Sequence, residues 1–167
     1  TERMDARGNI LIPLDEAALS EIIETLRLEE VQSVAVGLLH SYIDDRHERR
    51  VAEILSTELP QISITLSSEV SPEIREFDRW STASANAYVQ PLMSSYLGRL
   101  NRKLVTMGFD CPLSMMTSGG GIAAIEIARQ FPIRLVESGP AGGAILAAQI
   151  AGECGMDKVL SFDMGGT

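Results

Sequence analysis

The chain has 167 residues, of which 45% are hydrophobic and 22% are charged, as in an ordinary globular protein. Its formal net charge of −9 argues against non-specific binding to nucleic acid, which carries charge of the same sign. No stretch approaches the roughly 20 apolar residues of a membrane span, and the opening TERMDARGN lacks the order of a signal peptide. Two cysteines without CxxC spacing, Cys111 and Cys154, indicate free thiols in a reducing cytoplasm.

Helical and strand patterns alternate in the first part of the chain. Asp15 is expected to cap a first helix, and residues 31–42 (VQSVAVGLLHSY) have the aliphatic, β-branched character of a buried strand. Asp44 or Asp45 is expected to cap a second helix. Residues 62–70 (ISITLSSEV) predict the next strand.

A long helix is predicted over residues 72–108, with Ser71 as its N-cap. Apolar residues recur along its second half with a period of 3.6, and Gly108 fits the position just beyond its end. Because proline has no backbone N–H, Pro91 predicts a kink or a break in this helix. The aromatic side chains at helical spacing are expected in the core, with stacking on a ligand as the alternative: Trp80, Tyr88 and Tyr96.

Three glycine-rich turns are each expected to follow a strand in the last third of the chain: TSGGG (117–121), ESGPAGG (137–143) and DMGGT (163–167). Strands separated by helices predict an α/β fold, with a mostly parallel sheet covered by helices on both faces. A boundary is expected around residues 132–140, where the sequence becomes rich in glycine and alanine.

Glycine-rich turns at the carboxyl ends of strands can bind phosphate. Glycine lets an oxyanion approach the main-chain N–H groups, and a following helix adds its own N-terminal N–H groups and dipole. In open parallel sheets, ligands gather at this edge. The alternative is that the glycines only make tight turns.

The last turn offers more than bare amides. Asp163 could bind Mg²⁺ or a metal-bound water, Gly165 and Gly166 expose N–H groups, and Thr167 adds a hydroxyl. The alternative for Asp163 is an aspartate that caps a turn.

Asp-x-Gly-Gly-Thr resembles the phosphate-binding element of the actin, hexokinase and heat-shock ATPase superfamily. More closely, the run SSEVSPEIREFDRWSTASANAYVQPLMSSYLGRL, followed in order by TSGGG, VESGPAGGA and FDMGGT, resembles the hydantoinase A/5-oxoprolinase family. The resemblance implies a ribonuclease H-like (actin-like) lobe within a larger two-lobed enzyme that binds nucleotide in the cleft between its lobes. Residues 1–132 would form the later part of the first lobe, and residues 133–167 would lead into the second.

Members of that family use ATP to open a cyclic amide such as hydantoin or 5-oxoproline, and relatives carboxylate ketones. The resemblance therefore implies a hydrolase of cyclic amides with ATP and Mg²⁺ as cofactors, inactive as this segment alone, in an oligomer that can include a second hydantoinase-type subunit. Asp163 would be the catalytic residue and metal ligand. The nucleotide-binding residues would be Gly119, Gly120, Ser138, Gly139, Gly142, Gly143, Gly165, Gly166 and Thr167. The alternatives are a ketone carboxylase subunit of the same superfamily and a non-catalytic interaction domain.

Two histidines flank an acidic pair. His40 and His47 lie on either side of Asp44 and Asp45, which invites a metal site. The charged run DDRHERR is, however, typical of a solvated first helical turn.

A cluster of charged residues lies between the second strand and the long helix. By the resemblance, Glu69 and either Arg75 or Arg79 would line the cleft that faces the substrate. The alternative is that the carboxylates here only favour a helix N-terminus. Asn86, among small residues of the helix, could pack against another element or bond a ligand.

Overall fold

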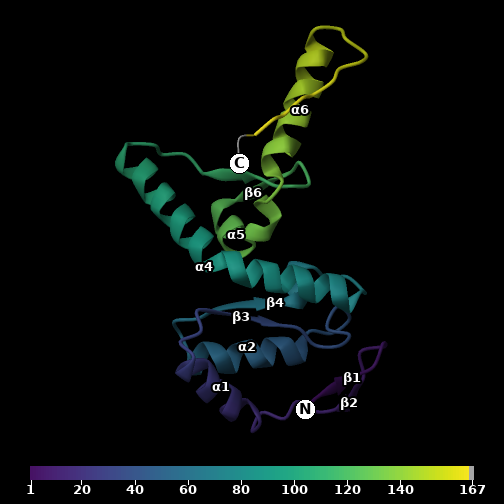
Figure 1. The fold of residues 1–167 in the computed structure, drawn as a ribbon, viewed down its shortest axis with the longest axis vertical. Helices are drawn as coiled ribbons and strands as arrows, with labels where there is room; N and C mark the ends of the chain where they lie inside the picture. Colours follow the sequence, from purple (N-terminus) through teal and green to yellow (C-terminus); the bar gives the residue numbers. More distant parts are fainter. Residues whose placement is uncertain (166–167) are drawn as a thin grey trace. The chain divides into compact units, whose positions relative to one another are not determined.

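The structure, a computed structural model, describes residues 1–165 (Figure 1). The chain divides into two compact units, Thr1–Leu92 and Met93–Thr167. Among the described residues, no helix has both the length and the apolar character that a membrane span requires.

The first unit is a mixed α/β structure with two small sheets. A hairpin opens it, and helices alternate with two parallel strands after that. Its elements are β1 (Arg3–Met4), β2 (Ile10–Ile12), α1 (Leu19–Leu28), β3 (Ser33–Val36), α2 (Arg46–Glu58), β4 (Ser63–Leu66), α3 (Ser67–Val70) and the first half of α4 (Glu76–Thr106).

Strands β3 and β4 pair in parallel, in register from Ser33↔Ser63 to Val36↔Leu66, and α2 forms the crossover between them. Figure 1 shows α2 on one face of this pair and the first half of α4 on the other. The prediction of helices on both faces is thus confirmed for these two strands. The mostly parallel sheet is not found in the described residues, because each of the three sheets has two strands and the other two are antiparallel hairpins.

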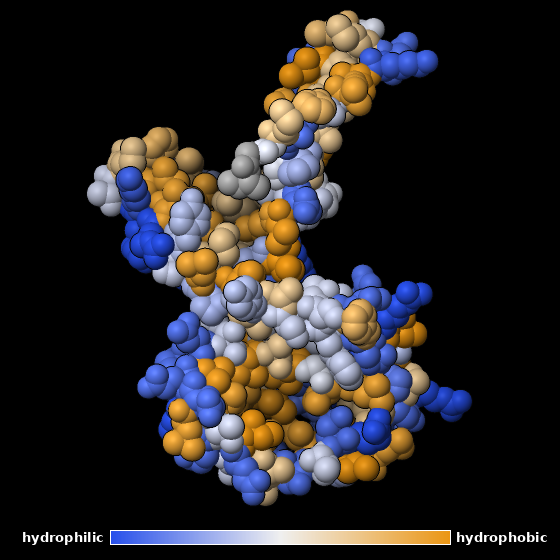
Figure 2. Space-filling model, viewed as in Figure 1, coloured by the Kyte–Doolittle hydropathy of each residue, from blue (hydrophilic) through white to orange (hydrophobic). Residues whose placement is uncertain are grey.

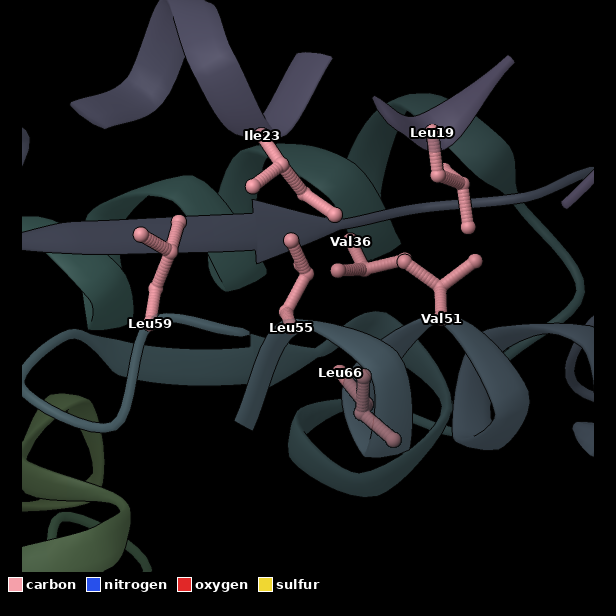
Figure 3. Packing of buried hydrophobic residues seen from close by; sticks show 7 residues of the cluster. All are labelled: Leu19, Ile23, Val36, Val51, Leu55, Leu59 and Leu66. Atoms are coloured by element: carbon pink, nitrogen blue, oxygen red, sulfur yellow. The ribbon is translucent and has the colours of Figure 1, made fainter. Parts of the chain in front are cut away.

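The core of the first unit lies between α1, α2 and the parallel strands. Figure 3 shows its buried side chains pointing toward one another: Leu19, Ile23, Val36, Val51, Leu55, Leu59 and Leu66. A spacing of four residues places the two members from α1, and the two from α2, on one face of each helix. Burying one such side chain contributes about 1.5–3 kcal/mol.

The second unit contains the rest of α4, a hairpin and two further helices. Its elements are β5 (Ser114–Met116), β6 (Ile122–Ala124), α5 (Ile125–Gln130), the 3₁₀ helix η1 (Pro132–Leu135) and α6 (Ser138–Glu153). Its small core consists of buried Leu97, Ile125 and Ala128.

Glycines end two helices, and the sequence predicts this for Gly108. Gly108 follows α4 with φ +88°, and Phe109 N donates to Leu104 O. Gly155 follows α6 with φ +67°, and Met156 N donates to Ala151 O. Both are Schellman caps, which need a residue in the left-handed region.

Helix α4 differs from its prediction at its start and in its middle. It begins at Glu76 instead of residue 72, and it continues through Pro91, so the predicted break is absent. Pro91 has no N–H to donate to the carbonyl of Ala87. Ser33 Oγ of β3 donates to that carbonyl instead.

The three aromatic residues of α4 are not in the core of the described structure: Trp80, Tyr88 and Tyr96 are 38%, 86% and 49% exposed. The buried positions of the helix are instead Ala83 and Ala87 together with polar Asn86 and Gln90. Small side chains let the helix approach the strands closely. Tyr88 lies on another face of the helix, whereas Trp80 lies against Gly37, just beyond β3.

Other predicted strands are shorter or absent. Residues 31–42 form a strand only at 33–36, and residues 67–70 of the second predicted strand form α3. Residues 133–135 belong to η1, and residues 158–165 have no regular structure. A strand needs a partner for its hydrogen bonds, and apolar character alone does not supply one.

Helix α6 is apolar on most of its surface. Figure 2 shows hydrophobic residues over much of its visible face, and Ile145, Leu146 and Ile150 are each about half exposed. Helices that are apolar all round are normally buried by further protein.

Candidate functional site

The predicted catalytic residue, Asp163, lies after α6 in a segment without regular structure, and its side chain is exposed. Met164 and Gly165 beside it are exposed as well, so an incoming ligand can reach this segment. Gly166 and Thr167, the other two predicted phosphate-binding residues of this turn, lie outside the described residues.

The TSGGG turn joins the two antiparallel strands β5 and β6, where the sequence predicted a turn from strand to helix. Three of its amides donate to carbonyls of the fold: Thr117 N to Gly121 O, Gly120 N to Thr117 O and Ser118 N to Arg134 O. Because these three N–H groups are already bonded within the protein, they are not free to hold a phosphate.

The SGPAGG segment is the start of α6, so Ser138, Gly139, Gly142 and Gly143 lie in its first two turns. Helix α6 packs against the hairpin at Gly142 and Ile145. A Cβ at Gly142 would stand 3.6 Å from Met116 Cγ, and one at Gly120 would stand 2.8 Å from Ile145 Cδ1. The structure therefore brings two of the three glycine-rich segments together.

A hollow of about 620 Å³ lies beside the hairpin turn. Its lining includes the turn residues and one cationic side chain: Thr117, Ser118, Gly119, Ile122, Ala123, Ala124, Ile127 and Arg134. Its volume is in the range of small-molecule sites, and the guanidinium of Arg134 favours an oxyanion. The two lining hydroxyls already donate to carbonyls of the fold, Thr117 Oγ1 to Gly121 O and Ser118 Oγ to Arg134 O.

A phosphate group can approach the backbone of a glycine only where no other atom occupies the space that a side chain would fill. A Cβ at Gly119, Gly139, Gly143 or Gly165 would meet no atom within 4 Å. The backbone is thus accessible at these four positions, while the same face of Gly120 is filled by Ile145. These positions leave room for an oxyanion-sized group, and one of them, Gly165, is two residues from the exposed carboxylate of Asp163.

The carboxyl edge of the β3–β4 pair holds a second polar assembly, which contains Arg79. This side chain is fully buried, and it donates to Ser67 Oγ, Glu73 O and Leu38 O at 3.1, 2.7 and 3.0 Å. Its carboxylate neighbour is Glu76 at 3.7 Å. The resemblance implied that either Arg75 or Arg79 lines the cleft, and the buried Arg79 donates to groups inside the protein instead of facing a substrate directly.

Glu48 is the acidic member of this assembly, and the sequence reasoning missed it. It is fully buried, and its two oxygens accept hydrogen bonds from Leu38 N, Ser67 Oγ and both N and Oγ of Ser68 at 2.6–3.0 Å. The signal was its position: Glu48, Val51 and Leu55 share one helix face.

The histidines do not form a metal site. His47 is buried, against its predicted solvation, and its Nδ1 lies 2.7 Å from Glu2 Oε2. His40 lies at φ +60° and contacts Tyr42 edge to face. No group of three metal-binding side chains occurs in the described part of the chain. In the same loop, hydrogen bonds from Arg46 lower the pKa of Asp44.

Glu69, the other residue proposed to face the substrate, lies in α3 and is partly exposed, with Arg49 Nη1 at 3.6 Å. Asn86 is fully buried, and its Nδ2 donates to Thr65 Oγ1 at 3.1 Å, so it packs between helix and sheet. Cys111 and Cys154 are free and exposed, as predicted.

These features define a mixed α/β protein whose glycine-rich segments leave main-chain groups open to an oxyanion-sized ligand. The chain belongs to the hydantoinase/oxoprolinase family. The family's profile, described as Hydantoinase/oxoprolinase, matches residues 79–167, and the profile of the Hydantoinase/oxoprolinase N-terminal region matches residues 1–59.

Similar proteins span the whole chain. An uncharacterized protein of Methanocaldococcus jannaschii is 40% identical over 166 residues, and caprolactamase subunit alpha of Pseudomonas jessenii is 34% identical over 165. Both alignments cover 99% of this chain and 24% of the relative, so the chain spans about a quarter of their length.

Two solved structures also match nearly the whole chain. The ATP-dependent caprolactamase of Pseudomonas jessenii matches with a TM-score of 0.88 at 34% identity, covering 99% of this chain and 24% of that one. Acetone carboxylase, described as carrying out ATP-dependent acetone carboxylation, matches with a TM-score of 0.80 at 25% identity, covering 93% and 22%.

Proposed function

We propose that this chain is part of an ATP-dependent enzyme that opens a cyclic amide. The observation that carries the proposal is the similarity to caprolactamase, which extends over 99% of the chain in both sequence and structure. Caprolactam is a cyclic amide, as are the hydantoins and oxoproline to which the family's description refers.

Within this chain, the candidate groups are those around the open glycines. ATP, when bound, would supply the driving force for ring opening. The carboxylate of Asp163 would hold Mg²⁺ or orient the attacking water, and the Gly165 amide, with Gly166 and Thr167 beyond it, would hold phosphate. The N–H groups of Gly119 and Gly139 would add donors that are fixed in place before the reaction, and the bare face of Gly143 would let the phosphate come close.

The wider architecture belongs to the same proposal. Residues 1–132 would complete one ribonuclease H-like lobe, and residues 133–167 would lead into another. A second subunit would join the enzyme, because the caprolactamase relative is itself named as an alpha subunit. The enzyme would be cytoplasmic.

The second candidate is a subunit of an ATP-dependent ketone carboxylase. The match to acetone carboxylase favours it. The two candidates differ in their requirements, because ring opening consumes water, whereas carboxylation of a ketone needs bicarbonate.

The test uses the full-length polypeptide that contains this chain. ADP release is measured with Mg²⁺-ATP and, in turn, caprolactam, 5-oxoproline, hydantoin, or acetone with bicarbonate. We expect a ring compound to stimulate release, and Asp163→Asn to abolish that stimulation. Stimulation only by acetone with bicarbonate supports the carboxylase instead. Absence of Mg²⁺-ATP binding supports a non-catalytic interaction domain.

A further inference from the structure

Two buried charged side chains meet at one serine beyond the end of β4. Ser67 Oγ donates to Glu48 Oε1 at 2.6 Å and accepts from Arg79 Nε at 3.1 Å. A hydroxyl has one hydrogen, so the carboxylate and the guanidinium together fix its orientation. Glu48 comes from α2 and Arg79 from α4, and both are 0% exposed.

The same pair holds the chain where it leaves β3. Leu38 N donates to Glu48 Oε1 at 2.8 Å, and Leu38 O accepts from Arg79 Nη2 at 3.0 Å. Glu48 also accepts from Ser68 N at 3.0 Å. Both strand ends are therefore tied to the same two side chains.

Stability alone does not account for this arrangement. Buried charges lose their hydration, and well-packed apolar side chains of similar volume often serve stability equally well or better. What the charges provide is fixed geometry at the carboxyl edge of a parallel strand pair, the edge where α/β proteins bind ligands.

The fixed segments carry polar groups at this edge. The chain after β3 places His40 at φ +60°, and Ser41 Oγ lies 3.3 Å from Ser67 Oγ. Helix α3, which begins at Ser67, carries the partly exposed Glu69.

We propose that Glu48 and Arg79 are positioning residues, which act through Ser67 to hold residues 38–42 and α3 as the wall that binds the cyclic amide. This inference rests on the proposed function for the identity of the ligand. The nucleotide groups proposed above lie in the second unit, so the wall should affect the ring substrate more than ATP.

The experiment compares Glu48→Gln and Arg79→Lys with a matched exposed pair in the full-length polypeptide. The controls are Glu16→Gln and Arg50→Lys, because Arg50 Nε and Nη2 donate to Glu16 at 2.7 and 2.8 Å on the surface of the same unit. For the variants at 48 and 79, we expect kcat/KM for the ring compound to fall at least about tenfold. The KM for ATP should stay within about twofold, and the controls should match wild type. A kcat/KM for the ring compound that equals the control values overturns the inference.

Amide hydrogen exchange gives a readout that does not need turnover. Loss of the Glu48 carboxylate should accelerate exchange at Leu38 and Ser68 at least about tenfold, with Leu55 in the core unchanged. Unchanged exchange at both amides overturns the positioning role. If no ring compound stimulates the wild type, the proposed function fails while this measurement still decides the inference. If Glu48→Gln does not fold, Ser67→Ala tests the same contacts without removing a charge.

Discussion

Ser33 Oγ donates a 2.5 Å hydrogen bond to the carbonyl of Ala87. In a regular helix this carbonyl would accept from the residue four positions later, which in α4 is Pro91 and has no N–H. The hydroxyl of a neighbouring strand thus replaces the missing helical bond.

Removal of this hydroxyl should leave a buried acceptor unsatisfied. We expect Ser33→Ala to lower the free energy of unfolding by about 1–3 kcal/mol, measured by urea unfolding. In a Pro91→Ala background the residue-91 amide can take the Ala87 carbonyl, so the same substitution should cost much less. Ser56→Ala is the control, because Ser56 Oγ bonds Ala52 O at an exposed position. Equal costs in the two backgrounds would contradict the explanation.

Gly37 lies directly against the indole of Trp80, since a Cβ there would stand 2.5 Å from Trp80 Cδ1. Gly37→Ala should therefore displace the ring and cost about 1–3 kcal/mol, seen as a lower Tm. Trp80→Ala should remove most of this cost in the double variant. Gly98→Ala is the control, because its Cβ would meet its nearest atom at 3.6 Å; an equal loss there would argue against the steric cause.

The pKa of Asp5 should lie below the ordinary value of 3.8. Its carboxylate accepts from Asn9 Nδ2, from Asn9 N and from Arg7 N, and these bonds favour the charged form. A lowered pKa means that the contribution to stability is present above pH 3.8 and is lost as the pH falls through the folded-state pKa. An NMR titration of the Asp5 carboxyl checks this, and Asn9→Ala should move the value toward 3.8. A wild-type pKa at or above 3.8 would refute the prediction.

Local signals in the sequence were sufficient for some elements and not for others. Gly108 ends α4 as predicted, because a left-handed cap depends only on the residues beside it. The run around Glu48 was interpreted as solvated from its charge, although its helical spacing to Val51 indicates a buried face. Of the predicted kink or break at Pro91, the break does not occur, because a distant strand supplies the missing hydrogen bond, which no local pattern reveals.

The candidate site shows the same limit. The sequence motifs identified the glycine-rich turns, but they did not show which elements pack or pair around each turn. The TSGGG turn belongs to a hairpin because β5 finds its partner in β6, directly after the turn. Residues 158–162 have strand composition and no partner among the described residues, so no strand forms there.

Adjacent glycines in the hairpin turn should separate binding from folding. Gly120 has φ +80° and faces Ile145, so Gly120→Ala should lower stability by about 1–2 kcal/mol. Gly119 faces open space, so Gly119→Ala should leave the Tm nearly unchanged. If phosphate approaches the backbone at this position, the new methyl group would obstruct it, and Mg²⁺-ATP affinity of the full-length polypeptide should fall about tenfold. Calorimetric titration measures this. Wild-type affinity in Gly119→Ala would remove this turn from the nucleotide site and leave the SGPAGG and DMGGT segments as the remaining candidates.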